Sequence, residues 1–403
     1  MYISRIIENK INQLSSQFKV LLITGARQVG KSTVLKMCNS KRNYVSLDDP
    51  KARLLALNDP EVFLEKYAPP VTIDEIQYAP NLFPYIKMIV DNSDKKGQYW
   101  FTGSQQFSMM ENVTESLAGR IAIINLKGLS LDEIQVNTYT EPFLPTKDYI
   151  QNKRKTSKVL GLKNVYEMIW RGAYPEINSS DNIDWQTFYS SYLQTYIERD
   201  IKHLNIVSNE VDFLKFIKVI AARTGQMLNY LDIANEVGIS QHIAKNWLDL
   251  LIRSDIIYLL PPYFRNINKR ILKTPKVYFS DTGLCSYLTD WETPNTLESG
   301  AMSGAIFETF VVNEIIKSYK NAGKEPNIYY YRDKDKKEID IIIERNGKLY
   351  PIEVKKTANP DKSMIKNFSV IPEDRLGEGA IVCLVKDDFP LTENVNMIPV
   401  GYI

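Results

Sequence analysis

The chain has 403 residues, of which 44% are hydrophobic and 24% are charged, and its formal net charge at pH 7 is +2. These fractions are ordinary for a globular protein, and the length suggests about two to four domains. A charge this close to zero neither indicates nor excludes nucleic acid as a partner. The two histidines, His203 and His242, are too few for a histidine-rich zinc site and argue against a Ser-His-Asp triad.

Cysteine usage and hydropathy indicate a cytoplasmic protein. Cys38, Cys285 and Cys383 are widely spaced and form no CxxC pair, which is typical of reduced thiols that mostly lie in a core. No apolar run is long enough to span a bilayer, so we expect no membrane partner. The start of the chain, MYISRIIENKINQLSSQF, is too polar for a signal peptide and predicts an amphipathic helix. Its apolar stripe consists of Ile3, Ile6, Ile7 and Ile11.

Residues 20–33 read VLLITGARQVGKST, which predicts a short apolar strand, a loop bounded by glycine and the start of a helix. The loop matches the phosphate-binding pattern G-x-x-x-x-G-K-[ST]. Its backbone N–H groups can cradle phosphate oxygens, Lys31 can place a charge on the β- and γ-phosphates, and the Ser32 hydroxyl can join a Mg²⁺ shell. The predicted nucleotide-binding residues here are Gly25, Ala26, Arg27, Gln28, Val29, Gly30, Lys31, Ser32 and Thr33.

Two later strands are expected to end at the same site. The stretch PPVTIDEIQ (69–77) supplies Asp74, which would hold Mg²⁺ through water, and Glu75, which is placed to polarise an attacking water. A residue in the position of Glu75 favours hydrolysis over passive binding. The stretch YWFTGSQ (99–105) offers Ser104 or Gln105 as a sensor of the γ-phosphate, and ordinary strand-end capping is the alternative.

Arg120 precedes another apolar strand within ESLAGRIAIINLKGLSLDEI (115–134). An arginine beside a P-loop site can stabilise transition-state charge, either in its own chain or in a neighbouring chain of a homo-oligomer. The alternative is a surface arginine that fixes its loop.

These stretches resemble the AAA-type P-loop ATPases of bacteria and archaea, in which ITGARQVGKST, TIDEIQ, FTGSQ and SLAGR occur in this order and spacing. GAYPE (172–176) and YLQTYIERDI (192–201) fit the same family, so the resemblance covers nearly the whole chain. It implies ATP and Mg²⁺ as cofactors, and it implies a nucleotide site at Lys31, Ser32, Asp74 and Glu75. It also implies Arg27 and Arg120 as finger or sensor residues.

The middle of the chain predicts a boundary, a helical lid and a helix-turn-helix. Residues 137–163 are polar and rich in Thr, Lys and Pro, and helical periodicity dominates from 164 to about 225. Residues 229–263 then read as two helices separated by Gly238, followed by a strand and a wing. The basic stretch 265–276 can contact DNA phosphates, although such modules often serve as structural contacts instead. The candidate recognition residues are Gln241, His242, Lys245 and Asn246.

Residues 338–356 read EIDIIIERNGKLYPIEVKK and predict a β-hairpin, because Asn346-Gly347 is typical of a two-residue loop. In that register Asp340 lies directly opposite Glu353. A bulge at Pro351 would shift the register by one residue. The predicted core face consists of Ile339, Ile341, Ile343, Tyr350, Ile352 and Val354. The other face, which a solvated surface would also explain, consists of Asp340, Ile342, Glu344, Leu349, Pro351, Glu353 and Lys355.

A helix is predicted over 303–319, with Glu308 at the border of its buried stripe. Glu308, Asp340, Glu353 and Lys355 together resemble the active pattern of the restriction-endonuclease-like, or PD-(D/E)xK, fold. The resemblance implies that the three acids hold Mg²⁺ or Mn²⁺, which makes facing carboxylates tolerable, and that Lys355 orients water or neutralises phosphoryl oxygens. In the alternative, a structural relic, Lys355 simply pairs with Asp340 and Glu353.

We therefore predict an α/β protein with four parts: a P-loop parallel-sheet ATPase domain (1–140), a linker and helical lid (141–225), a winged helix-turn-helix (226–290) and a restriction-endonuclease-like domain (291–403). The first functional hypothesis is an ATPase whose cycle gates a metal-dependent DNA nuclease or DNA-binding module. The second is a P-loop switch that binds DNA or a partner protein without cleaving it. A third, an adaptor with vestigial chemistry, is disfavoured by Glu75.

Overall fold

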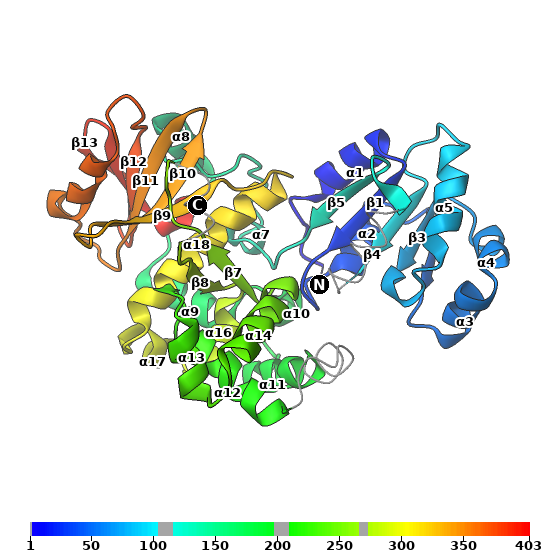
Figure 1. The fold of residues 1–403 in the computed structure, drawn as a ribbon. Coiled ribbons are helices and arrows are strands. Elements are labelled where there is room, and N and C mark those ends of the chain that lie inside the picture. The colour runs from blue at the N-terminus through cyan, green and yellow to red at the C-terminus, as the bar shows by residue number, and fades with distance from the viewer. Residues whose placement is uncertain (1, 104–115, 197–208, 266–272) are drawn as a thin grey trace.

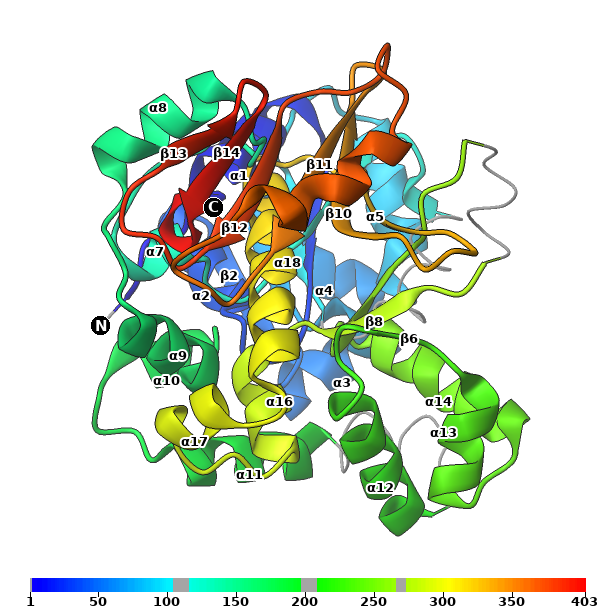
Figure 2. The same cartoon turned by 90° about the vertical axis from the view of Figure 1, so that its left-hand side faces the viewer.

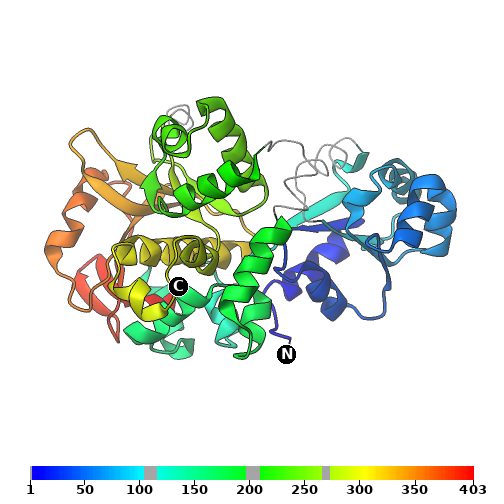
Figure 3. The ribbon, with the colours of Figure 1, turned by 90° about the horizontal axis from the view of Figure 1, so that it is seen from below.

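The computed structural model of the protein describes residues 2–103, 116–196, 209–265 and 273–403. The amino-terminal sheet and its helices form one lobe, at the right of Figure 1, and the remainder of the chain forms a second lobe. Within the second lobe a mostly helical layer lies beside a sheet formed by the carboxy-terminal residues (Figure 3).

The first lobe is built on a parallel five-stranded sheet with the order β2-β3-β4-β1-β5. Strand β1 shows why the sheet is covered on both faces, because every residue is buried and successive side chains alternate between two cores. Val20 and Leu22 belong to one core, whereas Leu21 and Ile23 belong to the other. The strands are β1 (Val20–Thr24), β2 (Asn43–Ser46), β3 (Val71–Asp74), β4 (Tyr99–Thr102) and β5 (Ile121–Asn125).

Local sequence sets several helix starts in this lobe. Helices α3 and α4 each begin with an Asp-Pro pair, in which the aspartate caps the helix and proline occupies its first position. Helix α1 begins only at Glu8, so the predicted stripe is wrong for Ile3 and Ile6, which precede the helix, while Ile7 and Ile11 are buried. The helices are α1 (Glu8–Gln17), α2 (Lys31–Cys38), α3 (Pro50–Asn58), α4 (Pro60–Lys66) and α5 (Leu82–Asp91), with the short 3-10 turn η1 (Ile76–Tyr78).

The middle of the chain is mainly helical. The boundary predicted over 137–163 contains a helix, α8, which Thr146 caps. Between α12 and α16, a three-stranded antiparallel sheet of order β6-β8-β7 adjoins helices α13 and α14, which are separated by Gly238 in the left-handed region at φ +86°. The elements are α7 (Leu131–Ile134), α8 (Lys147–Thr156), α9 (Leu162–Arg171), α10 (Pro175–Ser179), α11 (Trp185–Tyr196), α12 (Glu210–Ala221), β6 (Gln226–Met227), α13 (Tyr230–Val237), α14 (Gln241–Arg253), β7 (Ile257–Leu260) and β8 (Lys276–Phe279).

The carboxy-terminal part is a mixed six-stranded sheet of order β13-β14-β12-β11-β10-β9. The predicted helix over 303–319 is confirmed as α18, which runs along the sheet and also packs on α16 and α17 (Figure 2). The elements are α16 (Thr282–Leu288), α17 (Pro294–Ser299), α18 (Ser303–Asn321), β9 (Ile328–Arg332), β10 (Glu338–Arg345), β11 (Lys348–Val354), η4 (Lys362–Val370), β12 (Gly379–Cys383), β13 (Phe389–Thr392), β14 (Val395–Pro399) and η5 (Val400–Tyr402).

The hairpin prediction is confirmed in its register and wrong in one detail of its faces. Arg345 pairs with Lys348 and Ile341 pairs with Ile352, as the Asn-Gly loop requires. Ile339, however, joins Ile342 in a separate core, because β10 carries a bulge between these two residues where it pairs with β9. The second face is also not a solvated surface, since η4 covers its apolar residues Ile342 and Leu349, which are buried.

A single hydrophobic core connects the two lobes. It includes Ile23 of β1, Val165 of α9, Ile220 of α12 and Ile315 of α18. Continuity of this kind favours transmission of a local rearrangement over independent domain motion. Over the described ranges, no helix combines the length and apolarity needed to cross a bilayer.

Candidate functional site

The P-loop follows β1 and ends at α2, as the sequence predicts. Gly30 caps α2 in the left-handed region at φ +91°, and a Cβ on Gly25 would lie 2.2 Å from the backbone oxygen of Leu126, so only glycine fits there. The ammonium of Lys31 is buried within the loop, where it donates to the carbonyls of Gly25 (3.1 Å) and Ala26 (2.7 Å). The amino end of α2 and a buried cation therefore converge on one position, which is suited to an anion.

Asp74 at the end of β3 collects hydroxyl groups from three neighbouring elements. Its Oδ1 accepts from Ser32 Oγ at 2.6 Å and from Thr102 Oγ1, and its Oδ2 accepts from Tyr44 Oη at 2.7 Å. The parallel sheet brings these residues together, since β2, β3 and β4 end at the same edge as β1. Tyr44 and Thr102 were not predicted, because they have no motif of their own. Thr102 ends β4 and Tyr44 lies within β2, and both strands pair with β3.

Glu75 lies next to Asp74 in an uncommon backbone conformation, with φ 56° and ψ 48°. Its N–H donates to Thr102 Oγ1 at 3.1 Å, and its carboxylate accepts from the Gln77 side chain. A non-glycine residue in the left-handed region costs on the order of 1–3 kcal/mol and is often found at functional sites. The conformation turns Glu75 toward the same pocket as Lys31 and Ser32.

A pocket of about 810 Å³ adjoins the P-loop, and its opposite wall comes from the middle of the chain. A Cβ on Gly30 would lie 3.7 Å from Cγ of Pro175, so α10 approaches the loop closely. The volume falls within the range of small-molecule and cofactor sites, roughly 300–1,000 Å³. The lining residues are Arg27, Gln28, Gly30, Lys31, Ser32, Thr33, Glu75, Pro175, Glu176, Ile183, Asp184, Thr187, Phe188, Ser191 and Thr195. The sequence analysis identified the first seven and missed the wall from α10 and α11, although GAYPE contains Pro175 and Glu176.

Arg120 does not reach the pocket of its own chain. It lies just before β5, whose first residue Ile121 pairs with Val20 at the start of β1, whereas the P-loop follows the end of β1. At about 3.3 Å per residue, this separates Arg120 from the loop by roughly 13 Å along the strand. Its guanidinium instead pairs with Asp91, with Nη2 at 3.0 Å from Oδ2. This geometry gives no support to a role of Arg120 within its own chain, and a role in a neighbouring chain stays a prediction. Ser104 and Gln105 lie outside the described residues.

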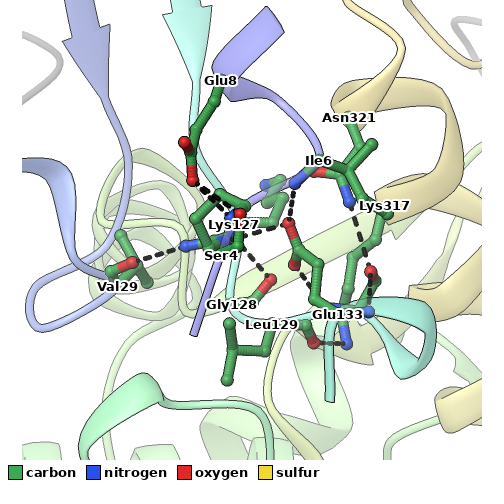
Figure 4. A network of polar contacts seen from close by, with 12 residues as sticks. Ser4, Ile6, Glu8, Val29, Lys127, Gly128, Leu129, Glu133, Lys317 and Asn321 are labelled. Atoms are coloured by element: carbon green, nitrogen blue, oxygen red, sulfur yellow. Dashed lines mark hydrogen bonds and ion pairs between the residues drawn. The ribbon is translucent and has the colours of Figure 1, made fainter. Parts of the chain in front are cut away.

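A buried polar network centred on Arg5 contacts the P-loop from behind (Figure 4). Its guanidinium donates to Val29 O in the P-loop at 2.9 Å, to Lys127 O at 2.8 Å and to Glu133 Oε1 at 3.0 Å. The Arg5 and Glu133 side chains are 2% and 0% exposed, so solvent does not screen this ion pair. Arg5 therefore links the P-loop to the segment that leaves the first lobe.

The network continues into α18 of the carboxy-terminal part. Leu131 N donates to Glu314 Oε2 at 2.7 Å, and Lys317 Nζ lies 2.6 Å from Glu314 Oε1. Lys317 Nζ also donates to Leu129 O at 2.8 Å (Figure 4). These hydrogen bonds hold residues 129–131 between Glu133 and α18. A change in the P-loop backbone at Val29 is thus connected through buried hydrogen bonds to the helix that carries Glu308.

A second charged cluster lies in the carboxy-terminal sheet. Lys355 Nζ contacts Asp340 Oδ2 at 3.0 Å and Glu353 Oε2 at 2.5 Å, so both carboxylates converge on one ammonium. Asp340 Oδ2 also accepts from Val354 N at 2.9 Å. Burial, followed by the charge of Asp340, raises the pKa of Glu353 to about 8. The sequence prediction that these three side chains gather is confirmed.

Glu308 is held by other partners. Its Oε1 accepts from Tyr278 Oη at 2.5 Å and from Lys276 Nζ at 3.1 Å, and both residues come from β8. Burial, followed by the charge of Asp340, raises the pKa of Glu308. Within the described ranges, no three His, Cys, Asp or Glu side chains are arranged to hold a metal ion. The predicted grouping of Glu308 with Asp340 and Glu353 around an ion is therefore not present, because lysines occupy the carboxylates. Lys276 was predicted only as part of a basic stretch.

The exposed side of α14 carries Gln241, His242, Lys245 and Asn246, as the helix-turn-helix prediction requires. Ser240 caps the helix, and Ala244 and Trp247 bury its other side. Of the basic stretch, Lys269 and Arg270 lie outside the described residues, and Lys276 is buried. The stretch is therefore not a uniformly exposed basic surface.

Comparison with known proteins divides the chain into three matched segments. Residues 17–135 match a family model described as an AAA domain. Residues 162–295 and 303–403 match two further models, each described as a domain of unknown function. The last of these gives no support to a restriction-endonuclease-like assignment.

Uncharacterized proteins of Mycobacterium bovis and Mycobacterium tuberculosis are each 27% identical to the chain over 388 residues, covering 95% of this chain and 80% of theirs. Among solved structures, a Walker-type ATPase of Pyrococcus abyssi is 14% identical, with a TM-score of 0.40 and coverage of 70% of this chain and 94% of that one. A signal-transduction ATPase with a tetratricopeptide-repeat sensor from Pyrococcus horikoshii has 13% identity and a TM-score of 0.27, covering 80% of this chain and 47% of that one. On the match over 17–135, the chain contains an AAA-type P-loop ATPase domain.

Proposed function

We propose that this protein is an ATP-hydrolysing switch in which the nucleotide alters how the middle and carboxy-terminal parts contact the P-loop lobe. The observation that carries the proposal is the pocket wall formed by α10 and α11, opposite Lys31 and Glu75. A nucleotide bound there contacts both lobes. ATP and ADP therefore differ in the contacts that they make with the second lobe. A ligand shifts a conformational equilibrium only through such differential contacts.

The residues around Asp74 fit a bound Mg²⁺, because a carboxylate and hydroxyls are the hard oxygen donors that this ion prefers. When bound with ATP, Mg²⁺ neutralises charge on the β- and γ-phosphates. In our proposal, Lys31 binds the same phosphates, Ser32 and Asp74 hold the ion, and Glu75 orients the attacking water. Backbone N–H groups from Gly25 to Thr33 bind the phosphate oxygens.

Hydrogen exchange of the full chain tests the switch. With Glu75→Gln to retain ATP, we expect ATP to slow exchange in α11, and to change exchange in α18 through the Arg5 network. Arg5→Ala should abolish the α18 response while ATP still slows α11, and Arg5→Lys should restore part of it. Glu61→Gln, an exposed acid on α4, is the matched control for turnover. Changes confined to residues 17–135 would contradict the proposal.

A second candidate function is metal-dependent cleavage of DNA by the carboxy-terminal part. Two observations favour it: Asp340 and Glu353 converge on the ammonium of Lys355, and Glu353 Oε1 is buried without a hydrogen-bond partner within the described part of the chain. An unpaired buried carboxylate oxygen is costly and is a natural cation ligand. In this candidate, Glu308, Asp340 and Glu353 hold Mg²⁺ or Mn²⁺, and Lys355 neutralises a phosphoryl oxygen.

The topology also supports DNA as a partner. Helices α12 to α14 with the β6-β8-β7 sheet have the element order of a winged helix, and α14 exposes polar side chains suited to a groove. The test is incubation with plasmid and oligonucleotide DNA in Mn²⁺, with and without ATP. Cleavage should disappear in Asp340→Asn and Lys355→Ala while ATP hydrolysis persists. If the protein binds the same DNA without cleaving it, the nuclease candidate fails and only the proposed switch function remains.

A further inference from the structure

Lys276 opens β8 and is 4% exposed, yet it is not a core residue in the usual sense. Its ammonium lies 3.1 Å from Glu308 Oε1 and 2.7 Å from Glu338 Oε1. A buried lysine needs this kind of pairing, because an unpaired ammonium in a low-dielectric interior is strongly disfavoured. Lys276 therefore belongs to the acidic cluster of the carboxy-terminal part, although it comes from the middle of the chain.

The sheet that carries Lys276 is held against the carboxy-terminal sheet by contacts of Tyr330 in β9 with residues 261–263 and with Thr274. Tyr263 N donates to Tyr330 O at 2.6 Å, and Tyr330 N donates to Pro261 O at 3.1 Å. The Tyr330 hydroxyl donates to Thr274 O at 2.5 Å, two residues before Lys276. The position of Lys276 thus depends on how the β6-β8-β7 sheet docks on β9.

Every carboxylate of the cluster that would serve a metal already has an ammonium partner. Lys276 forms an ion pair with Glu308, and Lys355 forms ion pairs with both Asp340 and Glu353. The cluster holds four acids, Glu308, Glu338, Asp340 and Glu353, against these two lysines and Arg332, whose Nη1 lies 3.0 Å from Glu338 Oε2. Removing one lysine leaves an excess of negative charge in a buried site, and a divalent cation compensates such an excess.

We propose that Lys276 is an internal cation that competes with a divalent metal for Glu308. The metal gains Glu308 only when Lys276 no longer pairs with it, and the position of Lys276 depends on how the β6-β8-β7 sheet docks on β9. This inference rests on the metal site of the second candidate function and adds its regulation by the middle of the chain. Lys355 stays with the site in either state, because it directly follows β11 and pairs with Asp340 and Glu353 of the same hairpin.

Mn²⁺ binding to the full-length protein, measured by electron paramagnetic resonance, tests the proposal without any need for catalysis. Lys31→Ala is present throughout, so that the nucleotide site contributes equally, and no nucleotide is added. We expect Lys276→Met to tighten Mn²⁺ binding at least tenfold, and Lys276→Arg to give no gain because the positive charge remains. Lys153→Met is the matched control, since Lys153 is a fully buried lysine paired with Asp132 away from the cluster.

The substitution leaves Glu308 and Glu338 without Lys276, so folding is checked by thermal melting. If Lys276→Met does not fold, the double variant Lys276→Met, Glu338→Gln removes the other acid that loses Lys276, which then has only Arg332 as a cationic partner, and should show the same gain. Asp340→Asn in either background should remove the gain, which assigns it to this cluster.

Three outcomes overturn the proposal in different ways. If Lys276→Met binds Mn²⁺ no more tightly than the parent while Asp340→Asn weakens both, Lys276 does not compete and the metal site stands. If no variant binds more tightly than its Asp340→Asn counterpart, the metal site itself fails, and the inference fails with it. An equal gain in Lys153→Met would show a general effect of removing buried lysines and would also contradict the proposal.

Discussion

The nucleotide site and the carboxy-terminal acidic cluster use similar side chains in opposite ways. At the nucleotide site, nine consecutive residues and one strand end supply the groups, and Lys31, Ser32 and Glu75 face an open pocket. In the cluster, residues from β8, α18, β10 and β11 meet, and their charges face one another. The charged side chains of the nucleotide site face a ligand pocket, whereas those of the acidic cluster form ion pairs with one another.

This difference between the two sites shows that a set of residue types does not by itself define a ligand site. A contiguous loop fixes its donors by backbone geometry, independently of the rest of the fold. Carboxylates assembled from distant segments take whichever cation lies nearest, and here those cations are lysines.

Lys31→Ala should reduce ATP hydrolysis at least a hundredfold and weaken nucleotide binding. Residues 25–33 contain two cationic side chains, Lys31 and Arg27, and the variant loses the one that is directed at the phosphates. Removing a preorganised group that stabilises transition-state charge typically costs about 10²–10³ in rate. Phosphate release measures the rate, and Lys41→Ala, an exposed lysine beyond α2, is the control. A Lys31→Ala protein that hydrolyses ATP at the parental rate would show that the pocket is not the catalytic site.

Glu75→Gln should bind ATP with parental affinity and hydrolyse it about a hundredfold more slowly. A positioned acid-base group contributes about 10²–10⁴ to a rate, and glutamine keeps the shape of glutamate without its charge. Nucleotide titration and single-turnover hydrolysis separate the two effects. Parental turnover in this variant would assign the water-activating role to another residue.

Asp281→Asn should change how stability depends on pH. Asp281 accepts from Ala173 N and Leu284 N, each at 2.7 Å, and burial raises its pKa. Because the folded state then holds the proton more tightly than the unfolded state, stability falls as pH rises from about 4, the unfolded value, toward the raised folded value. The variant lacks this contribution, so the parent should lose stability relative to it across that window in urea unfolding. Parallel pH profiles would contradict the raised pKa.

Arg120→Ala should change ATP hydrolysis by less than about twofold in a dilute sample, since Arg120 pairs with Asp91 on the edge of the sheet away from the P-loop. An exposed pair of this kind contributes little to stability. A larger loss of activity would mean that Arg120 reaches the nucleotide pocket of a neighbouring chain. In that case the parental rate per chain should fall on dilution through dissociation, and a flat rate would exclude a neighbour's site as well.

Local sequence alone was sufficient for the features that depend on short-range geometry. The P-loop and its glycines, the Asp-Pro helix starts, the register of the Asn346-Gly347 hairpin and the helix carrying Glu308 all follow from contiguous residues. Their physical cause is the restricted backbone conformation of glycine and proline, and the fixed periodicity of helices and strands. These constraints act before the chain packs, so the sequence states them directly.

Only the tertiary structure decided which distant residues meet. Lys276 reaches Glu308 because the β6-β8-β7 sheet docks on β9, and Arg5 reaches Val29 because the start of the chain lies behind the P-loop. The bulge in β10 moved Ile339 to another core, and the parallel pairing of β5 with β1 put Arg120, which precedes β5, at the end of the sheet opposite the P-loop. None of these contacts has a local signal, because a buried charge selects its partner from whatever the whole fold brings within a few ångströms.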